Sequence, residues 1–332
     1  MSATAALLLD PAETPADQYR AAESKCVIVD LSDRDQIELT GADRAAFLHN
    51  FCTQEIKKLA AGHGAEAFLT NIKGRILGHV LVFVGDDALW LDGPPGTAAA
   101  IVPHLDRYLI TEDVQIADRS SDWGELALIG PQAAQIVDKL IPGGGQWQLF
   151  QHGHGEGITV RRFSFTRQPG WLVGTSRAQL PSLAARLLTA SAVLCSRDVF
   201  HALCIEAGFP QYGIDLTDEH LAQEAGRTKQ AISFTKGCYL GQEPIARIDA
   251  LGHTNRELRS LQLDGSSVPN PGDKVLQPGT DTELGTVSSA ARSPVTKRAV
   301  AFAMLRHEAS GQGTGIEIAV NDQREQGTVG WN

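Results

Sequence analysis

EAFLTNIKGRILGHVLVFVGDDALWLDG occupies residues 66–93, and this stretch decides the fold. Its apolar residues form three short runs, at 66–71, 76–84 and 88–92, that are rich in β-branched and aromatic side chains. NIKGR and VGDD separate the runs, and their Gly, Asn and Asp residues favour tight turns. The stretch is therefore predicted to form three consecutive strands joined by two turns.

The segments on either side extend this prediction to a whole subdomain. Upstream, residues 36–40 alternate between apolar and polar residues like a strand, and a helix begins near residues 41–43. Asp43 suits the positive N-terminal end of that helix. Downstream, we expect a helix around 97–109 and a strand near 114–117. We interpret the order as β-α-β-β-α-β, that of a ferredoxin-like split unit.

A second round of similar elements follows. GELALIG (124–130) has the pattern of a strand, and PQAAQIVDKLI (131–141) has that of a helix. Strands near 158–164 and 170–174 and a helix near 177–189 complete the round. No repeat of individual residues accompanies this loose structural repetition.

The pattern of predicted secondary structure changes near residue 256. ELRSLQLDG, DKVLQ, ELGTVSSAA, RAVAFAMLR and GIEIAV are short strand-like runs interrupted by Gly, Pro, Asp and Ser. Such runs without a long helical pattern predict a small antiparallel barrel. We place a domain boundary near residues 250–256.

Bulk properties narrow the class of protein. The 332 residues suffice for two or three domains, and the net charge of −10 opposes broad attraction to nucleic acid or anionic membranes. No apolar segment is long enough to cross a bilayer. The first residues carry no basic leader, and acidic residues outnumber basic ones among them, which argues against secretory and mitochondrial signals. We therefore expect a cytoplasmic protein.

The cysteine pattern predicts free thiols. The five cysteines are scattered, and no two form a Cys-x-x-Cys pair. This usage is typical of a reducing compartment. It argues against a zinc site or an iron–sulfur cluster held by this chain alone, because such sites usually need about four ligands. We expect no metal site.

FTKGCYLGQEPIAR, residues 234–247, presents one of these thiols in a polar, bendable setting. Lys236 and Arg247 are candidate cations that would favour the thiolate of Cys238. Gly237 and Gly241 permit tight backbone and leave the sulfur accessible. From these residues alone, a small buried cysteine in a glycine turn is the favoured interpretation, because most single cysteines are structural.

Glu206 ends an apolar helical pattern in IEAGFPQYGIDL, residues 205–216. A carboxylate there can accept two parallel N–H bonds from a planar amino-pyrimidinone, such as the head group of a pterin or a guanine. The plainer alternative is an exposed glutamate near the C-terminal end of a helix.

Two further polar groups admit both a binding and a structural interpretation. Lys73 and Arg75 in NIKGRI, residues 71–76, could hold an anionic ligand tail or could form a solvated hairpin tip. His152, His154 and Glu156 could suggest a metal site. A solvated hairpin loop is the better interpretation, because nothing nearby supplies a dependable third ligand.

Five segments taken together resemble a folate-binding protein of the YgfZ type, a group within the superfamily of the glycine-cleavage T-protein, the aminomethyltransferase. The resemblance covers roughly residues 25 to 332, and KGCYLGQE is its most specific part. The segments are IVDLSDRDQIELTGADRAAFLHNFCTQEIKKL, FLTNIKGRI, IEAGFPQYGIDL, KGCYLGQEPIAR and LGTVSSAARSP.

The resemblance implies an α+β cloverleaf that combines ferredoxin-like split β-α-β units with a C-terminal antiparallel β-barrel. It divides the chain into an N-terminal extension (1–24), a folate-binding region of two α+β subdomains (25–253) and the barrel (254–332). It implies tetrahydrofolate, or a folate derivative, as the cofactor. The residues that it assigns are Glu206 to the pterin, Lys236, Arg247, Lys73 and Asn71 to folate binding, and Cys238 with Lys236 to reactive-thiol chemistry.

The function that the resemblance implies is assembly or maintenance of iron–sulfur proteins, including radical enzymes that modify tRNA, through the reactive Cys238 beside the folate pocket. The expected partners are folate and iron–sulfur client or assembly proteins, without direct contact with nucleic acid or membrane, and the expected state is a monomer. Gly78 and His79 stand where the transferase has paired aspartates, so we do not expect classical transferase activity. A tetrahydrofolate-dependent aminomethyltransferase, or a related one-carbon transferase or demethylase, is the alternative. A scaffold that has lost folate is a third interpretation.

Overall fold

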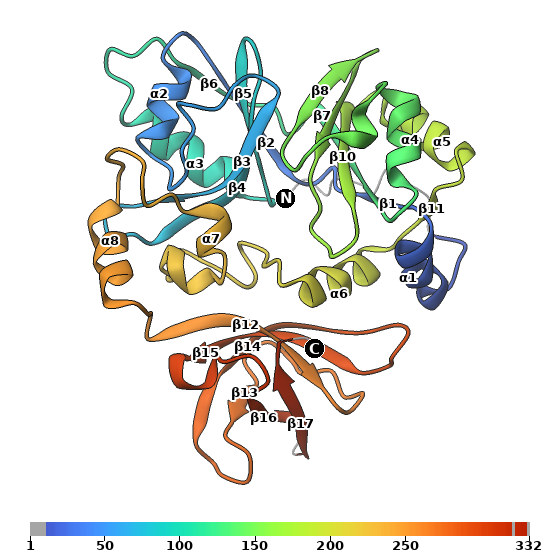
Figure 1. The fold of residues 1–332 in the computed structure, drawn as a ribbon, viewed down its shortest axis with the longest axis vertical. Coiled ribbons are helices and arrows are strands. Elements are labelled where there is room, and N and C mark those ends of the chain that lie inside the picture. Colours follow the sequence, from blue (N-terminus) through green and yellow to red (C-terminus); the bar gives the residue numbers. More distant parts are fainter. Residues whose placement is uncertain (1–10, 321–322, 331–332) are drawn as a thin grey trace.

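The computed structural model describes residues 11–320 and 323–330, and its first sheet contains the three strands predicted from residues 66–93 (Figure 1). The sheet is antiparallel, in the order β3-β4-β5-β2-β6. Three strands rather than two lie between its helices, so it has one strand more than the β-α-β-β-α-β order. The elements are β2 (Asp35–Thr40), α2 (Arg44–His49), β3 (His63–Thr70), β4 (Ile76–Val84), β5 (Ala88–Gly93), α3 (Thr97–Asp106) and β6 (Gln115–Asp118).

The second sheet has six strands, in the order β11-β1-β7-β10-β9-β8. The predicted strands and helices of the second round are present. The pattern missed β1 and its parallel partner, the edge strand β11, because both are very short. The elements are β1 (Val27–Asp30), β7 (Trp123–Ile129), α4 (Ala133–Leu140), β8 (His152–Gly155), β9 (Ile158–Arg162), β10 (Gly170–Ser176), α5 (Leu180–Thr189) and β11 (Val193–Leu194).

Each sheet buries one face under its own helices. Apolar side chains of α2 and α3 form one core with the first sheet, and those of α4 and α5 form another with the second. Figure 1 shows the two sheets side by side, each with its helices on the outer side. The remaining faces therefore meet between the two sheets.

A buried cluster of charged side chains joins the two sheets. The guanidinium Nη1 of Arg161 on β9 lies 2.9 Å from Gln36 Oε1 on β2, 3.2 Å from Glu125 Oε1 on β7 and 3.4 Å from Asp92 Oδ2 on β5. Arg34 donates to the other oxygen of Asp92 at 2.6 Å. Because opposite charges compensate each other here, the cluster tolerates burial that a single ion would not.

Aromatic rings surround the same guanidinium. The Cζ of Arg161 lies 4.7 Å from the ring centre of Phe83, 5.6 Å from that of Trp123 and 6.0 Å from that of Trp90. Only 2% of Arg161 is exposed. The rings add cation–π attraction and exclude water from the ion pairs.

Glu125 is predicted to give the protein a pH-dependent stability. Burial, and then the neighbouring Asp92, raise the pKa of Glu125 well above its ordinary value. A carboxyl group whose pKa is raised in the folded state stabilises the fold below its ordinary pKa, and this contribution is lost as the pH rises through the raised value. Glu125→Gln mimics the protonated form. Thermal melting from about pH 5 to about pH 9 should show the stability of the variant, relative to wild type, increasing with pH. A constant or decreasing difference would contradict this assignment.

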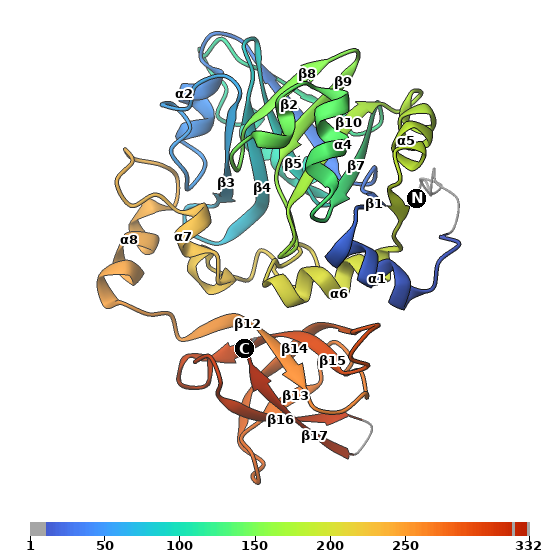
Figure 2. The ribbon, with the colours of Figure 1, turned by 45° about the vertical axis from the view of Figure 1, so that its right-hand side comes forward.

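A helical layer lies between the sheets and the barrel (Figure 2). The long α6 (Arg197–Ala207) begins where Ser196 accepts a hydrogen bond from the backbone of Val199, and Gly208 ends it in left-handed backbone. Residues expected as an N-terminal extension form α1 (Pro15–Ser24), which contacts α6. The other helices are α7 (Thr228–Ala231), α8 (Gln242–Leu251) and three 3₁₀ segments, at Gly144–Gln146, Ala222–Ala225 and His307–Ala309.

The C-terminal region forms the predicted barrel, with closed order β12-β15-β14-β13-β16-β17. The sequence pattern missed β17, most of whose residues are polar. The strands are β12 (Arg256–Leu263), β13 (Lys274–Leu276), β14 (Glu283–Arg292), β15 (Ala299–Arg306), β16 (Gly315–Val320) and β17 (Gln323–Val329).

Asp215 connects the barrel to the helical layer. The pairing of β14 with β15 shifts register between Val287 and Ser289, and both Ser288 and Ser289 donate to Asp215 Oδ1, at 2.7 and 2.6 Å. The backbone of Gln211 donates to the other oxygen. The bulge thus lets two consecutive serines bind one buried carboxylate.

Candidate functional site

A cavity of about 340 Å³ lies where the two sheets meet the helical layer. Helix α6 supplies one wall, because Arg197, His201 and Cys204 recur at helical spacing on one face. His79 from β4 and Phe165 from the loop after β9 are among the residues that supply the opposite wall. The volume is that of a small-molecule site.

The cavity combines aromatic walls with a few polar groups. Phe165, Phe200 and Phe209 line it, and the guanidinium of Arg34 lies 4.8 Å above the ring centre of Phe165. The Nε2 of His201 is buried and has no hydrogen-bond partner. An unpaired buried nitrogen is costly, so a ligand that reached this atom would gain a hydrogen bond there.

Some residues that line the cavity carry charged side chains. Arg197 forms an ion pair with Asp33, and both side chains are about half exposed. Arg34 is more deeply placed and is held by Asp92. The lining therefore offers cations near an apolar interior, an arrangement that suits a planar ring carrying an anionic tail.

His79 is fixed inside the cavity wall by a buried ion network. Its Nε2 lies 2.8 Å from Glu66 Oε1, and Arg227 donates to both oxygens of Glu66, at 2.8 and 2.5 Å. Despite burial, which opposes ionisation, the hydrogen bonds from Arg227 and His79 lower the pKa of Glu66 to about 2. Glu66 is therefore ionised at neutral pH.

Sequence reasoning missed Glu66 and Arg227. Glu66 stands alone as an acidic residue in an otherwise apolar strand, and this was the available signal. Arg227 is distant in sequence, so no local pattern could pair the two. His79 on β4 forms its hydrogen bond with Glu66 on the neighbouring strand β3.

Glu206 lies outside the described cavity lining. Its Oε2 accepts a hydrogen bond from the hydroxyl of Tyr19 on α1 at 2.6 Å, and both residues are buried. Burial raises the pKa of Glu206, while the bond from Tyr19 lowers it. The contact ties α1 to α6. The assignment of Glu206 to a pterin remains a prediction.

Cys238 is exposed, whereas the other four cysteines are buried. Its loop is anchored from both sides. Leu240 donates its backbone N–H to Asn50 O, and the hydroxyl of Thr70 donates to Leu240 O. An accessible thiol on a fixed loop differs from the small buried cysteine that the residues alone favoured. Cys238 is not among the residues that line the central cavity.

Lys236 anchors the same loop. Its ammonium donates to the carbonyl oxygens of His49, Cys52 and Gln54, at 2.6, 2.7 and 3.0 Å. These three bonds use all three donors of the ammonium group. Burial lowers the pKa of Lys236. The roles of Lys236 in folate binding and thiol chemistry remain predictions, and either would require this ammonium to exchange partners.

The predicted residues of NIKGRI lie against the cysteine block. Asn71 Oδ1 accepts hydrogen bonds from the backbone of Lys73 and Arg75, which shapes the turn. Gly241 has a φ of +85°, and a Cβ there would come within 2.3 Å of Asn71 O, so the close approach requires glycine. The structure thus brings Asn71 and the segment around Cys238 together.

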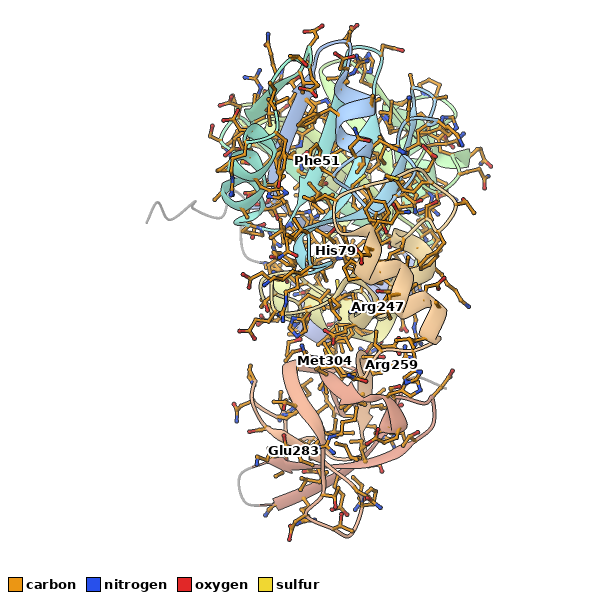
Figure 3. The ribbon with its side chains drawn as sticks, turned by 90° about the vertical axis from the view of Figure 1, so that its left-hand side faces the viewer. Phe51, His79, Arg247, Arg259, Glu283 and Met304 are labelled. Carbon is orange, nitrogen blue, oxygen red and sulfur yellow. The ribbon has the colours of Figure 1, made fainter. Side chains whose placement is uncertain are left out.

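The cations near this contact point to solvent. Lys73 at the turn and Arg247 on α8 are both exposed. Figure 3 shows Arg247 and His79 in the middle part of the molecule, above the barrel. The predicted site residues therefore lie in separate places: Glu206 faces α1, and the others surround the exposed Cys238 loop.

His152 of the β8–β9 hairpin has a structural contact, whereas His154 is exposed. The Nε2 of His152 donates to Val84 O at 3.0 Å, and burial lowers the pKa of His152 to about 4. Within residues 11–320 and 323–330, no group of three or more His, Cys, Asp or Glu residues is arranged to hold a metal ion. In the same residues, no helix combines the length and apolar character needed to cross a membrane.

Two family models match the chain. The model described as the GCVT N-terminal domain matches residues 11–236, and the glycine cleavage T-protein C-terminal barrel domain matches residues 256–330. These matched regions correspond to the two sheets with most of the helical layer and to the barrel.

Individual proteins of known sequence or structure are also similar to this chain. An Arabidopsis thaliana chloroplastic protein named "Putative transferase" is 31% identical over 75% of this chain, and the match spans 59% of its own length. An aminomethyltransferase of Rubrobacter xylanophilus is 24% identical over 92% of this chain and 82% of its own. The crystal structure of glycine cleavage system aminomethyltransferase T from Bartonella henselae superposes with a TM-score of 0.86 at 18% identity, covering 96% of this chain and 88% of that one.

Proposed function

Because the chain belongs to the glycine cleavage T-protein family, we propose that it is a tetrahydrofolate-binding accessory factor for iron–sulfur proteins that acts through Cys238. The family binds tetrahydrofolate, and a folate cofactor is consistent with this membership. Its role in assembly or maintenance of iron–sulfur proteins is the further step. That step is supported by the resemblance of KGCYLGQE to the YgfZ type.

The central cavity fits a folate. Its aromatic walls suit the flat pterin ring, and the unpaired Nε2 of His201 offers a hydrogen bond. Arg34 and Arg197 are the lining cations that would attract the carboxylates of the glutamate tail. Bound tetrahydrofolate would supply a nitrogen that carries one-carbon groups. The chain would orient this ring and exclude water from it.

The exposed, anchored position of Cys238 is the observation that carries the proposal. A thiol that serves only packing is usually buried, as the other four cysteines are. Three carbonyl bonds to Lys236 hold the loop, so the thiol is presented at a defined place. Such a thiol can react with, or pass sulfur or metal to, a partner protein that reaches the surface.

A complementation experiment tests this proposal. A strain that lacks the gene would receive wild type, Cys238→Ser or, as a matched control, Cys195→Ala, and the activities of iron–sulfur enzymes would be measured. We expect wild type and the buried-thiol control to restore activity and Cys238→Ser to fail, although thermal melting shows it folded. Full complementation by Cys238→Ser would make the thiol dispensable and would refute the proposal.

One-carbon transfer is the alternative, because several similar proteins are named aminomethyltransferases. We expect purified protein with tetrahydrofolate and the aminomethylated lipoyl carrier to show no turnover. The reason is that Gly78 offers no carboxylate and His79 is occupied by Glu66 through Nε2. Turnover at ordinary enzyme rates, on the order of 1–10³ per second, would favour the alternative.

A further inference from the structure

His79 is held rigidly in the cavity wall. Its ring stacks on Phe209 at 5.2 Å between ring centres, with an angle of 21°, and lies 4.8 Å from the ring of Phe68. Only 4% of His79 is exposed, yet the residue lines the cavity. Two aromatic neighbours and one hydrogen bond fix the plane of the imidazole, so its edge has one orientation.

Glu66 fixes where the proton of the imidazole lies. Because Glu66 is ionised, its oxygens can only accept hydrogen bonds, and Nε2 of His79 must therefore donate. Arg227 already balances the negative charge of Glu66 through two hydrogen bonds. With a neutral imidazole, the cluster of His79, Glu66 and Arg227 has no net charge. A buried site favours this state over one with a second cation beside Arg227.

A neutral imidazole that donates through Nε2 accepts through Nδ1. Glu66 occupies Nε2, so Nδ1 is the nitrogen left for a ligand in the cavity. The orientation of the ring and the tautomer of its neutral form are both set before a ligand arrives. The wall of the cavity therefore presents an acceptor, because the neutral tautomer with hydrogen on Nδ1 would lose the hydrogen bond from Nε2 to Glu66.

We infer that His79 is a specificity-determining residue that selects the reduced, tetrahydro form of a pterin ligand over the fully oxidised form. This inference rests on the proposed folate binding. A tetrahydropterin carries hydrogen on both N5 and N8, whereas in the oxidised ring both nitrogens are acceptors without hydrogen. A fixed acceptor on the wall pairs with the first form. With the oxidised form, the lone pair of Nδ1 would face the lone pair of a ring nitrogen. Such repulsion lets a site discriminate strongly between the two forms of the ligand.

Equilibrium binding of tetrahydrofolate and folic acid, measured without oxygen, tests the inference. We expect wild type to bind tetrahydrofolate at least about tenfold more tightly, the scale of one buried hydrogen bond. His79→Phe keeps a ring between Phe68 and Phe209 but removes the acceptor. It should lower the preference by about tenfold, mainly by weakening tetrahydrofolate binding.

His201→Phe is the matched control. The structure gives Nε2 of His201 no partner, so its tautomer can adjust to either ligand. This variant should change the affinities for both ligands alike and leave the preference unchanged. Thermal melting of each variant establishes that it is folded.

The outcomes separate this inference from the proposed function. Equal affinity of wild type for the two ligands would overturn the role of His79, and this result needs no variant. An unchanged preference in folded His79→Phe would overturn it as well. If wild type binds neither ligand, the proposed folate binding fails, and the inference fails with it.

Discussion

Arg161→Ala is expected to lower the free energy of unfolding by about 3–5 kcal/mol, the scale for removing one partner from a buried ion pair. The guanidinium bonds Gln36, Asp92 and Glu125, so its loss leaves two buried carboxyl groups without their shared cation. It also removes the cation–π contacts with the surrounding aromatic rings. Because the cluster joins both sheets, the loss should loosen their packing as well. Denaturant unfolding of the purified variant measures the change.

Arg119→Ala is the control for this prediction. Arg119 forms an ion pair with Glu38 on the surface of the first sheet, where solvent screens the charges. We expect little change in stability. If Arg161→Ala were no more destabilising than Arg119→Ala, the buried cluster would not be the link between the sheets.

Cys238 is expected to be alkylated about a thousandfold faster at neutral pH than Cys26 or Cys195. Burial raises the pKa of Cys26 and of Cys195 from an ordinary value of 9.0 to about 12. Each unit lowers the reactive thiolate fraction about tenfold, and burial also blocks access. Burial likewise raises the pKa of Cys52 and Cys204. Timed alkylation followed by peptide mass spectrometry ranks the five thiols.

Unfolding the protein provides the internal control for the alkylation experiment. In denaturant, all five cysteines should react at similar rates, because burial no longer separates them. If folded protein labels Cys238 no faster than the buried thiols, the loop is closed in solution and the thiol is structural.

The sequence predicted the parts of the fold that local patterns encode. Short apolar runs separated by turn residues identified the strands of residues 66–93 and most of the barrel. It did not predict β1 and β11, which are too short to show a period, or β17, whose exposed face is polar. Pairing of such strands is decided by distant partners, which a local pattern does not contain.

In the candidate site, too, the sequence predicted local features but not contacts between distant residues. Cys238 and its glycines were recognisable because the block is contiguous in sequence. Lys236 was expected to act on the thiol, but the carbonyl groups that bind it belong to residues 49–54, far away in the chain. Glu66 and Arg227 are 161 residues apart and meet only in the folded protein. Long-range charge partners of this kind need a structure.

Asp215 lines the central cavity and also receives the two serine hydroxyls of the barrel. A ligand in the cavity would therefore stabilise the segment around Asp215 that also binds the barrel. Ligand binding and docking of the barrel would favour each other. The filled protein would resist proteases along the connection to the barrel, and the empty protein would be degraded sooner. Cellular abundance of this protein would then follow the supply of its ligand, without any change in gene expression.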